Sequence, residues 1–236
     1  MMRRVSGNRI NLDTPHLAEP ALFARDEGSA NDFEGDVWRR EYVVVDLETT
    51  GLGADSQMTE IGAVRLKNGE IVDTFTTLVN PQMQIPPQIT ALTGITDLMV
   101  ADAPHPDEAI RQFLHFAQLE SSILIAHNAS FDCGFLTRAA TAANVEWPCP
   151  SVVDTLALAR ALLPRPLVSN HRLGTLMRHF KISNDCAHRA LADATATAQV
   201  FAGLVAELRK LGGTDFADLK ELPCFDNISR SRTDRL

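Results

Sequence analysis

Short apolar runs separated by turn signals open the patterned part of the chain. Residues 42–45 form an aliphatic run typical of a strand buried on both faces. A second run, residues 61–66, leads into Asn68-Gly69, a dipeptide that favours a tight hairpin turn. The return strand is expected over residues 71–79. These runs predict three antiparallel strands.

Further along, strands alternate with helical patterns. Residues 123–126 and 152–154 are short apolar runs that predict two more strands. Residues 86–96 predict an extended lead, a short helical turn and a loop. The longer helices are expected to begin at Pro106 and to cover residues 131–142, the segment after 154 through Leu163, 172–180 and 191–211. The pattern predicts the α/β class, with a mixed sheet of three antiparallel strands plus parallel strands, flanked by helices.

The same pattern suggests where the folded domain begins and ends. Residues 1–40 show no sustained apolar period and are expected to be a partly disordered extension, with a short helix near residues 32–40. Residues 41–211 are expected to form one domain. Residues 212–236 contain Pro223 and a polar, basic ending, so a C-terminal tail is expected.

Composition narrows the class of protein. The chain is 45% hydrophobic and 22% charged, as in ordinary globular proteins, and its net charge of -8 argues against a broad basic surface for duplex nucleic acid. The four cysteines show no CxxC spacing, which argues against a zinc site or a disulfide framework. No apolar run approaches a membrane span or a secretory signal, so a cytoplasmic protein with no membrane partner is expected.

An acidic pair follows the first strand. Asp46 and Glu48 are two residues apart, so on a strand both side chains point to the same face. Like charges about 4 Å apart repel by roughly 4 kcal/mol at an effective dielectric of about 20. A hard divalent cation such as Mg²⁺ or Mn²⁺ removes this repulsion; the alternative is two solvated acids at a strand end. Thr49, Thr50 and Gly51 slightly favour a functional site over solvated acids, because small residues let backbone N–H groups approach a phosphate or nucleotide sugar.

A further carboxylate, Asp132, follows the strand at residues 123–126. It lies in the first turn of an expected helix, where it could simply stabilise the helix start, with Asn128 or Ser130 as a cap. His127 most often serves such a turn by hydrogen bonding. Asp132 alone therefore does not indicate a functional site; it does so only together with the other acids.

The last two candidates are His188 and Asp193, five positions apart. Asp193 belongs to the long final helix and His188 to the loop before it. A histidine with a pKa near about 6.5 can accept a proton from a metal-bound water at neutral pH; the alternative is an exposed loop histidine. Four acids and one histidine can together serve two hard divalent cations and one proton acceptor, which suits phosphodiester hydrolysis.

Other charged residues carry weaker signals. A stretch whose only acid is Asp185 could form a basic rim beside the acids, or an ordinary solvated helix face. The basic residues of this stretch are Arg160, Arg165, Arg172, Arg178, Lys181 and Arg189. His171 could contact phosphate, and it is left undecided. The histidines expected to have no such role are His16, His105, His115 and His179.

The three segments Asp46-Leu47-Glu48, His127 to Asp132 and His188 to Asp193, taken in this order, resemble the DEDDh 3′–5′ exonucleases. The resemblance is to the branch of bacterial DNA polymerase III proofreading (epsilon-type) exonucleases, and it covers about residues 41–205. The five-residue spacing and the histidine distinguish this branch from its tyrosine-bearing sister group. The resemblance implies a ribonuclease H-like fold.

The resemblance also implies roles for the candidate residues. Asp46, Glu48 and Asp193 would hold the ion that binds the attacking water, and Asp46 with Asp132 would hold a second ion. His188 would be the general base. The products would be nucleoside 5′-monophosphates released from the 3′ end.

The resemblance further implies contacts with the terminal nucleotide, made by Gln88, Thr93 and Asn128 as well as by the small residues after the acidic pair. Thr93 stands where some proofreading subunits carry histidine. The expected partners are a single-stranded or frayed 3′ end of DNA and a DNA polymerase subunit. Two alternatives stay open: an exoribonuclease that trims RNA, and a non-catalytic polymerase-associated binding module. Scarce surface aromatics favour DNA weakly.

Overall fold

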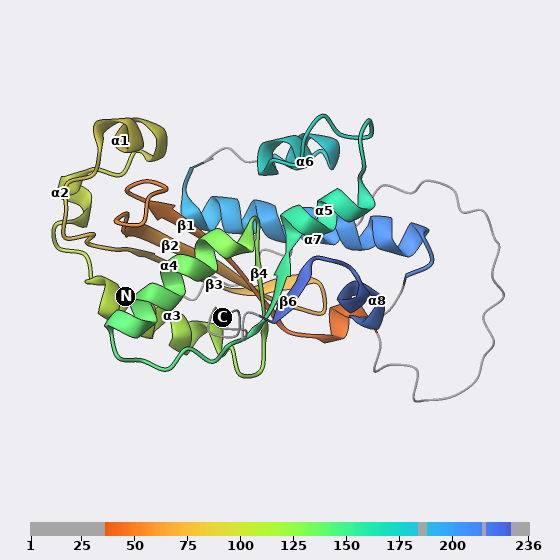
Figure 1. Cartoon of the computed structure of the whole chain (residues 1–236), viewed down its shortest axis with the longest axis horizontal. Helices are drawn as coiled ribbons and strands as arrows, with labels where there is room; N and C mark the ends of the chain where they lie inside the picture. The colour runs from red at the N-terminus through yellow and green to blue at the C-terminus, as the bar shows by residue number, and fades with distance from the viewer. Residues whose placement is uncertain (1–35, 184–187, 214–215, 228–236) are drawn as a thin grey trace, which may run out of the picture.

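A six-stranded mixed sheet forms the centre of the computed structural model, which describes residues 36–183, 188–213 and 216–227 (Figure 1). Its strand order is β3-β2-β1-β4-β5-β6. The strands are β1 (Tyr42–Thr49), β2 (Met58–Lys67), β3 (Glu70–Leu78), β4 (Ile123–Ala126), β5 (Ser151–Asp154) and β6 (Phe225–Asn227). β1, β2 and β3 pair antiparallel, β4 and β5 continue the sheet in parallel, and β6 runs antiparallel to β5. The predicted class and mixed sheet are confirmed.

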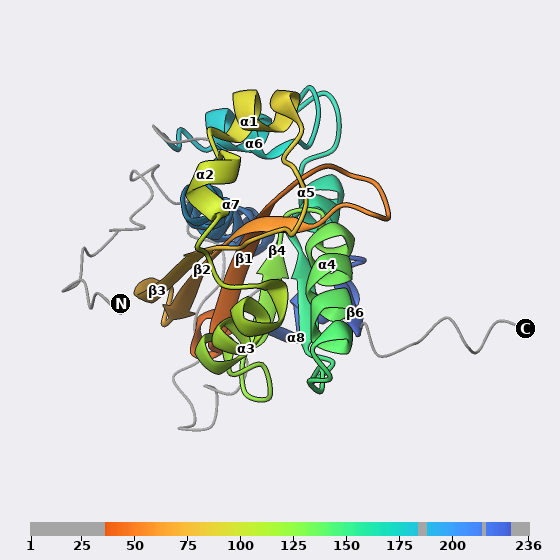
Figure 2. The same ribbon diagram turned by 90° about the vertical axis from the view of Figure 1, so that its left-hand side faces the viewer.

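Helices cover both faces of this sheet (Figure 2). On one face lie α3 (Pro106–Ala117) and α4 (Ala129–Ala142). On the other lie α5 (Thr155–Leu162), α6 (Leu173–His179), α7 (Ala190–Lys210) and α8 (Phe216–Glu221). The remaining short helices are α1 (Pro87–Thr93), α2 (Asp97–Val100) and the 3₁₀ helix η1 (Val37–Arg39). In Figures 1 and 2, α1 and α6 both lie at the top of the molecule.

Alternation along β1 decides where its acids point. Val43 and Val45 pack in the core beneath α3 and α4, whereas Tyr42 and Val44 pack in the core beneath α7. Because side chains alternate along a strand, Asp46 and Glu48 continue the row that faces α7. The apolar core thus gives way to carboxylates at the end of the strand.

The β2–β3 turn has the geometry that its sequence predicts. Asn68 and Gly69 both have positive φ, 53° and 78°, and Lys67 pairs with Glu70 across the turn. Two consecutive residues with positive φ suit the right-handed twist of a hairpin. The predicted hairpin is confirmed, and it fixes the register of β2 beside β1.

The predicted domain limits are too narrow at both ends. Val37 is buried in the core, and its carbonyl accepts a hydrogen bond from the Tyr42 hydroxyl. At the other end, Phe216 and Leu219 are buried, and β6 adds a strand to the sheet. Residues 216–227 are therefore part of the fold and not the expected tail, because a short helix and a three-residue strand carry too little periodicity to be recognised. Residues 1–35 lie outside the described residues.

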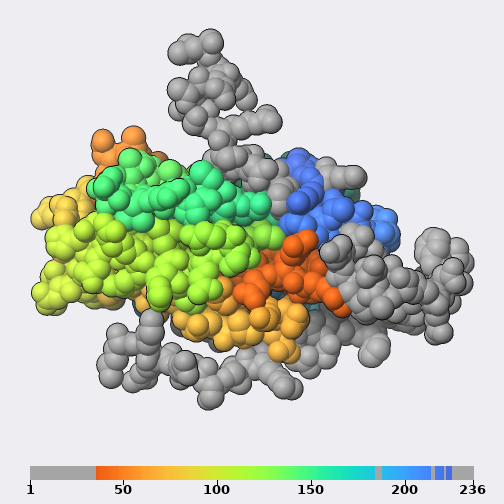
Figure 3. All heavy atoms as spheres, turned by 90° about the horizontal axis from the view of Figure 1, so that it is seen from below, coloured from red at the N-terminus to blue at the C-terminus, as the bar shows by residue number. Residues whose placement is uncertain are grey.

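The first and last described segments lie side by side (Figure 3). Arg40 stacks on the ring of Phe216, with 5.2 Å from its guanidinium carbon to the ring centre, and Arg209 pairs with Asp36 at 3.1 Å. A hollow of about 360 Å³ opens here, lined in part by Arg40 and Cys149. It lies where β1, β4 and β5 begin, at the end of the sheet opposite the acidic pair.

Two further findings concern expected absences. Among the described cysteines, Cys133, Cys149 and Cys224 form no disulfide, while Cys186 lies outside the described residues. Within the described ranges, every helix is too short or too polar to cross a membrane.

Candidate active site

The acidic pair at the end of β1 lies in a strongly negative environment. Burial, followed by repulsion from Asp132, Asp193, Glu48 and Glu60, raises the pKa of Asp46 well above its ordinary value. The pKa of Glu48 is raised to about 7, mainly by burial and then by the charges of Asp193 and Glu60. Carboxylates from β1, β2, α4 and α7 therefore lie close enough to repel one another.

Asp132 enters this environment from the start of α4. Asn128, in a left-handed conformation with φ 70°, turns the chain out of β4, and its N–H donates to Asp154 at 3.0 Å. The Asn128 side chain does not cap the helix. Burial raises the pKa of Asp132 to about 8, although N–H groups of Leu47 and of its own backbone donate to the carboxylate. This side chain is thus a buried acid held against the end of β1.

His188 and Asp193 reach the same place from the start of α7. One ligand atom each from Glu48, His188 and Asp193 lie within 4.8 Å of one another, the spacing of a metal site. The His188 N–H donates to Asp193 Oδ2 at 3.0 Å, which holds His188 in its left-handed conformation with φ 64°. The His188 side chain is exposed, so it borders the acids from the solvent side.

The small residues after the acidic pair use their side chains to shape the turn. Thr49 donates its hydroxyl to the Gly51 carbonyl at 2.8 Å. The Thr50 hydroxyl accepts the Gln57 N–H at 3.0 Å and lies 3.7 Å from Met83 Sδ. Both threonines are buried, so a ligand beside this turn would meet backbone and not hydroxyl groups.

The predicted contacts on α1 differ from each other. Gln88 is exposed and open to a ligand. Thr93 is buried; its hydroxyl donates to the Ile89 carbonyl at 3.0 Å and accepts the Ile95 N–H at 3.1 Å. The Thr93 hydroxyl therefore stabilises the C-terminal end of α1. The resemblance to relatives that carry histidine at this position gave no indication of this role.

The basic residues predicted to form a rim lie between the end of α5 and the start of α7, around α6. The exposed residues of this set are Arg160, Arg165, Arg172, Arg178, Lys181 and Arg189. Arg189 differs from the others, because it pairs with the buried Glu60. His171, which the sequence left undecided, donates from Nε2 to the Leu163 carbonyl at 2.8 Å and so ties the loop before α6 to the end of α5.

Glu60 is a residue that the sequence analysis missed. It lies on β2, opposite Glu48 in the sheet register, and is almost completely buried. The signal available in the sequence was a single acid inside an otherwise mostly apolar strand. A buried carboxylate needs partners, and those partners come from the start of α7.

Comparison with known proteins gives the class of this domain. Residues 43–201 match the RNase T family, described as exonuclease, and the chain belongs to this family. The matched span contains the acidic pair, Asp132, His188 and Asp193. The fold is the ribonuclease H-like fold of the DEDD exonucleases.

The same comparisons identify the domain more closely as a DEDDh-type 3′–5′ exonuclease that acts on nucleic acid. Exonucleases of this family bind divalent metal ions. The predicted family, enzyme class and resemblance to polymerase III exonucleases are confirmed.

The curated relatives that this chain matches are longer proteins. It is 45% identical over 227 residues to MT2247 of Mycobacterium tuberculosis, whose name describes a bifunctional exonuclease/endonuclease; the match covers 93% of this chain and 34% of that protein. It is 43% identical over 173 residues to the PolC-type DNA polymerase III of Bacillus subtilis, covering 72% of this chain and 12% of the polymerase. The chain thus spans only 34% and 12% of the lengths of these two relatives.

Solved structures agree on the fold. Exonuclease X in complex with 5′ overhanging duplex DNA superimposes with a TM-score of 0.58 and 28% identity, over 75% of this chain and 98% of that one. The nuclease domain of 3′hExo, a DEDDh family member bound to rAMP, gives a TM-score of 0.64 at 18% identity, over 76% and 96% of the two chains.

Proposed function

We propose that this domain removes nucleotides one at a time from single-stranded or mispaired 3′ ends of DNA. The observation that carries the proposal is the meeting of one ligand atom each from Glu48, His188 and Asp193 within 4.8 Å, beside the half-buried Asp46 and the buried Asp132. Four carboxylates with repelling charges and one histidine make a centre that suits hard cations and a proton acceptor.

The donor set fits two Mg²⁺ or Mn²⁺ ions, because it is rich in carboxylate oxygen and its mutual repulsion calls for positive charge. Asp46, Glu48 and Asp193 would hold one ion, and Asp46 with Asp132 the other. When bound, such ions supply an activated water and stabilise the charge that develops on the leaving oxygen.

The residues of the chain carry the remaining steps. His188 takes the proton from the attacking water at its exposed imidazole. The water oxygen bonds to the terminal phosphorus, and the bond from phosphorus to the 3′-oxygen breaks. The 3′-oxygen takes a proton from solvent, so the shortened strand ends in a 3′-hydroxyl; a nucleoside 5′-monophosphate leaves, and His188 releases its proton to solvent. The backbone at Thr49, Thr50 and Gly51, with the exposed Gln88 and the turn at Asn128, would contact the terminal nucleotide.

DNA is favoured over RNA by the relatives above 25% identity. The polymerase relatives are DNA polymerases by name, and the exonuclease X structure holds DNA. The single tyrosine, Tyr42, is buried, so it offers no ring on which an RNA base could stack. Association with a DNA polymerase is a further part of the proposal, supported by the same relatives, in which the matching segment is part of the polymerase chain.

The test is a nuclease assay with 3′-labelled and 5′-labelled oligonucleotides in Mg²⁺ or Mn²⁺. We expect shortening from the 3′ end of single-stranded DNA, lost with EDTA and reduced at least about 100-fold by His188→Ala or Asp46→Asn. His179→Ala is the matched control, since His179 is exposed at the end of α6. Full metal-dependent activity of Asp46→Asn would contradict the proposal, and parallel reactions with RNA and mismatched duplex define the preferred substrate.

A further inference from the structure

Glu60 holds the start of α7 from the neighbouring sheet. Its two carboxylate oxygens accept from Arg189 Nη2 at 2.7 Å and from Arg189 Nε at 3.1 Å, and the second oxygen also accepts the Ala190 N–H at 3.1 Å. The side chain of Glu60 is 2% exposed and that of Arg189 is 46% exposed. Such a two-pronged pair between arginine and a carboxylate fixes orientation as well as distance.

The pair replaces a local helix cap. Arg189 occupies the N-cap position of α7 but makes no side-chain capping bond. The first N–H groups of a helix need acceptors, and an anion is stabilised there by the helix dipole. Glu60, on strand β2, supplies both the hydrogen-bond acceptor and the negative charge, although it lies 130 positions before Ala190 in the chain.

Close backbone contact at Gly62 completes this anchor. Glu60 and Gly62 are two residues apart on β2 and face α7 together. An added Cβ at Gly62 would overlap the backbone of Ala190 and Leu191. The first turn of α7 therefore rests directly on β2, and Glu60 fixes its rotation and position there.

Arg189 and Ala190, the two residues that Glu60 holds, lie between the catalytic candidates His188 and Asp193 in the chain. His188 immediately precedes Arg189, and Asp193 lies in the first helical turn. The His188 N–H bonds to Asp193, so both move with the start of the helix. Glu48 lies opposite Glu60 in the β1–β2 register, so the anchor also sets the distance from Glu48 to both residues.

We propose that Glu60 and Arg189 form a positioning pair that places His188 and Asp193 against Glu48 for metal binding and proton transfer. The proposal rests on the proposed nuclease function. Glu60 acts through Arg189 and not as a metal ligand itself, since three donors already occupy its oxygens. Substitution of residues that hold metal ligands in place without binding the metal typically lowers metal affinity or activity by about 10–100-fold.

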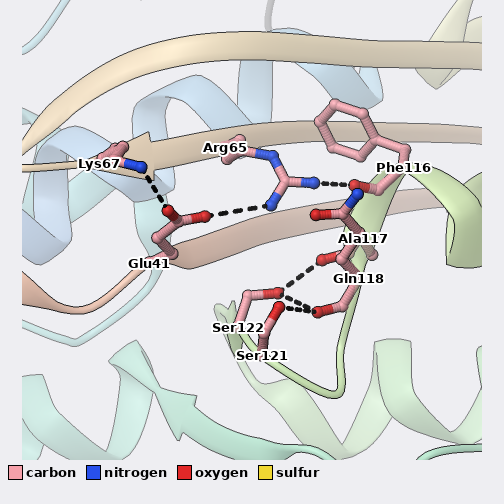
Figure 4. A network of polar contacts seen from close by, with 8 residues as sticks. All are labelled: Glu41, Arg65, Lys67, Phe116, Ala117, Gln118, Ser121 and Ser122. Atoms are coloured by element: carbon pink, nitrogen blue, oxygen red, sulfur yellow. Dashed lines mark hydrogen bonds and ion pairs between the residues drawn. The ribbon is translucent and has the colours of Figure 1, made fainter.

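The variants are Glu60→Gln, Arg189→Gln, the double variant and the conservative Arg189→Lys. The matched control is Glu41→Gln, which breaks an ion pair with Lys67 (2.7 Å) at the opposite end of the same strands (Figure 4). Glu41 also lies 3.7 Å from Arg65, whose guanidinium donates to the Phe116 carbonyl. The control therefore removes a charged partner of β2 without approaching α7.

Each variant is measured for kcat and KM on single-stranded DNA, for Mn²⁺ affinity by electron paramagnetic resonance, and for thermal unfolding. We expect Glu60→Gln and Arg189→Gln to lower kcat about 10–100-fold and to weaken Mn²⁺ binding, with KM within about 2-fold of wild type. The double variant should lose no more than either single one, Arg189→Lys should retain an intermediate kcat, and Glu41→Gln should match wild type.

Two results would overturn the positioning pair: unchanged kcat and Mn²⁺ affinity in folded Glu60→Gln and Arg189→Gln, or an equal loss in Glu41→Gln. If Glu60→Gln fails to fold, Arg189→Gln and Arg189→Lys decide by the same measurements. A wild-type protein that cleaves nothing would refute the proposed function instead. The Mn²⁺ affinities would then still test the positioning pair on their own.

Discussion

At the scale of single residues, function and stability conflict most directly at Asp46. Its pKa is raised by burial and by Asp132, Asp193, Glu48 and Glu60, so its ionised form is unfavourable without a cation. The Asp46 carboxylate, which the proposed metal site needs, therefore lowers the stability of the metal-free protein.

This conflict gives a prediction for Asp46→Asn. The amide keeps the shape of the side chain but removes a repelling charge, so the metal-free protein should gain about 1 kcal/mol of unfolding free energy at pH 8, while nuclease activity is lost. Chemical denaturation in EDTA measures the gain. Asp55→Asn, in an exposed loop, is the control and should change neither property. A less stable Asp46→Asn would show that the acids do not repel as described.

The sequence predicted most residues of the site but not the one that positions them. Asp46, Glu48, Asp132, His188 and Asp193 stand in short segments whose spacing carries meaning by itself. Glu60 has meaning only through its register with Glu48 and through the arrival of α7, two facts that no local pattern contains. The Thr93 hydroxyl was also out of reach, because its direction depends on how α1 ends.

At the scale of elements, the start of α7 on β2 is the tightest contact in the site. Gly62→Ala should destabilise the protein by about 1–3 kcal/mol or more, because its Cβ would overlap backbone atoms that cannot move aside independently. Gly134→Ala is the control: its Cβ meets only the end of Arg138 at 3.9 Å inside α4, and alanine favours a helix by up to about 1 kcal/mol. Denaturation midpoints measure both, and a neutral Gly62→Ala would mean that α7 does not rest on β2.

The strength of local patterns also explains which elements could be predicted. β1, the β2–β3 hairpin and α7 follow from long apolar periods and from Asn68-Gly69. α8 and β6 could not be recognised, because each has six residues or fewer and forms by pairing with segments distant in sequence.

At the scale of the whole molecule, α8 and β6 close the sheet beside β5. A chain truncated after Gly213 loses the buried Phe216 and Leu219 and leaves β5 as an unpaired edge. Each buried apolar side chain contributes about 1.5–3 kcal/mol, so the loss is a large part of the stability of an ordinary domain. We expect a lowered unfolding midpoint and aggregation, measured by thermal unfolding and light scattering. A chain ending at Asn227 is the control, and equal stability of the two would show that α8 and β6 add nothing.

The acids also set how the stability of the whole molecule depends on pH. The pKa values of Glu48 and Asp132 are raised to about 7 and about 8, and that of Asp46 is raised well above its ordinary value. In the unfolded chain these carboxyls ionise near their ordinary values of 3.8 and 4.5. Between about pH 7 and 8 the native state therefore holds more protons than the unfolded state. The lowered pKa of His127 acts in the opposite direction, but mainly below its ordinary value of 6.5.

It follows that the unfolding free energy of the metal-free protein falls as pH rises from 7 to 8, by about 1.4 kcal/mol per pH unit for each extra proton that the native state holds. Excess Mn²⁺ should raise stability more at pH 8 than at pH 7, because metal ions bind the ionised carboxylates and displace their protons. Chemical denaturation at the two pH values, in EDTA and in Mn²⁺, measures both slopes, and Asp46→Asn should flatten the slope in EDTA. A metal-free protein that gains stability over this interval would refute the clustering of raised carboxyl pKa values on which the metal site depends.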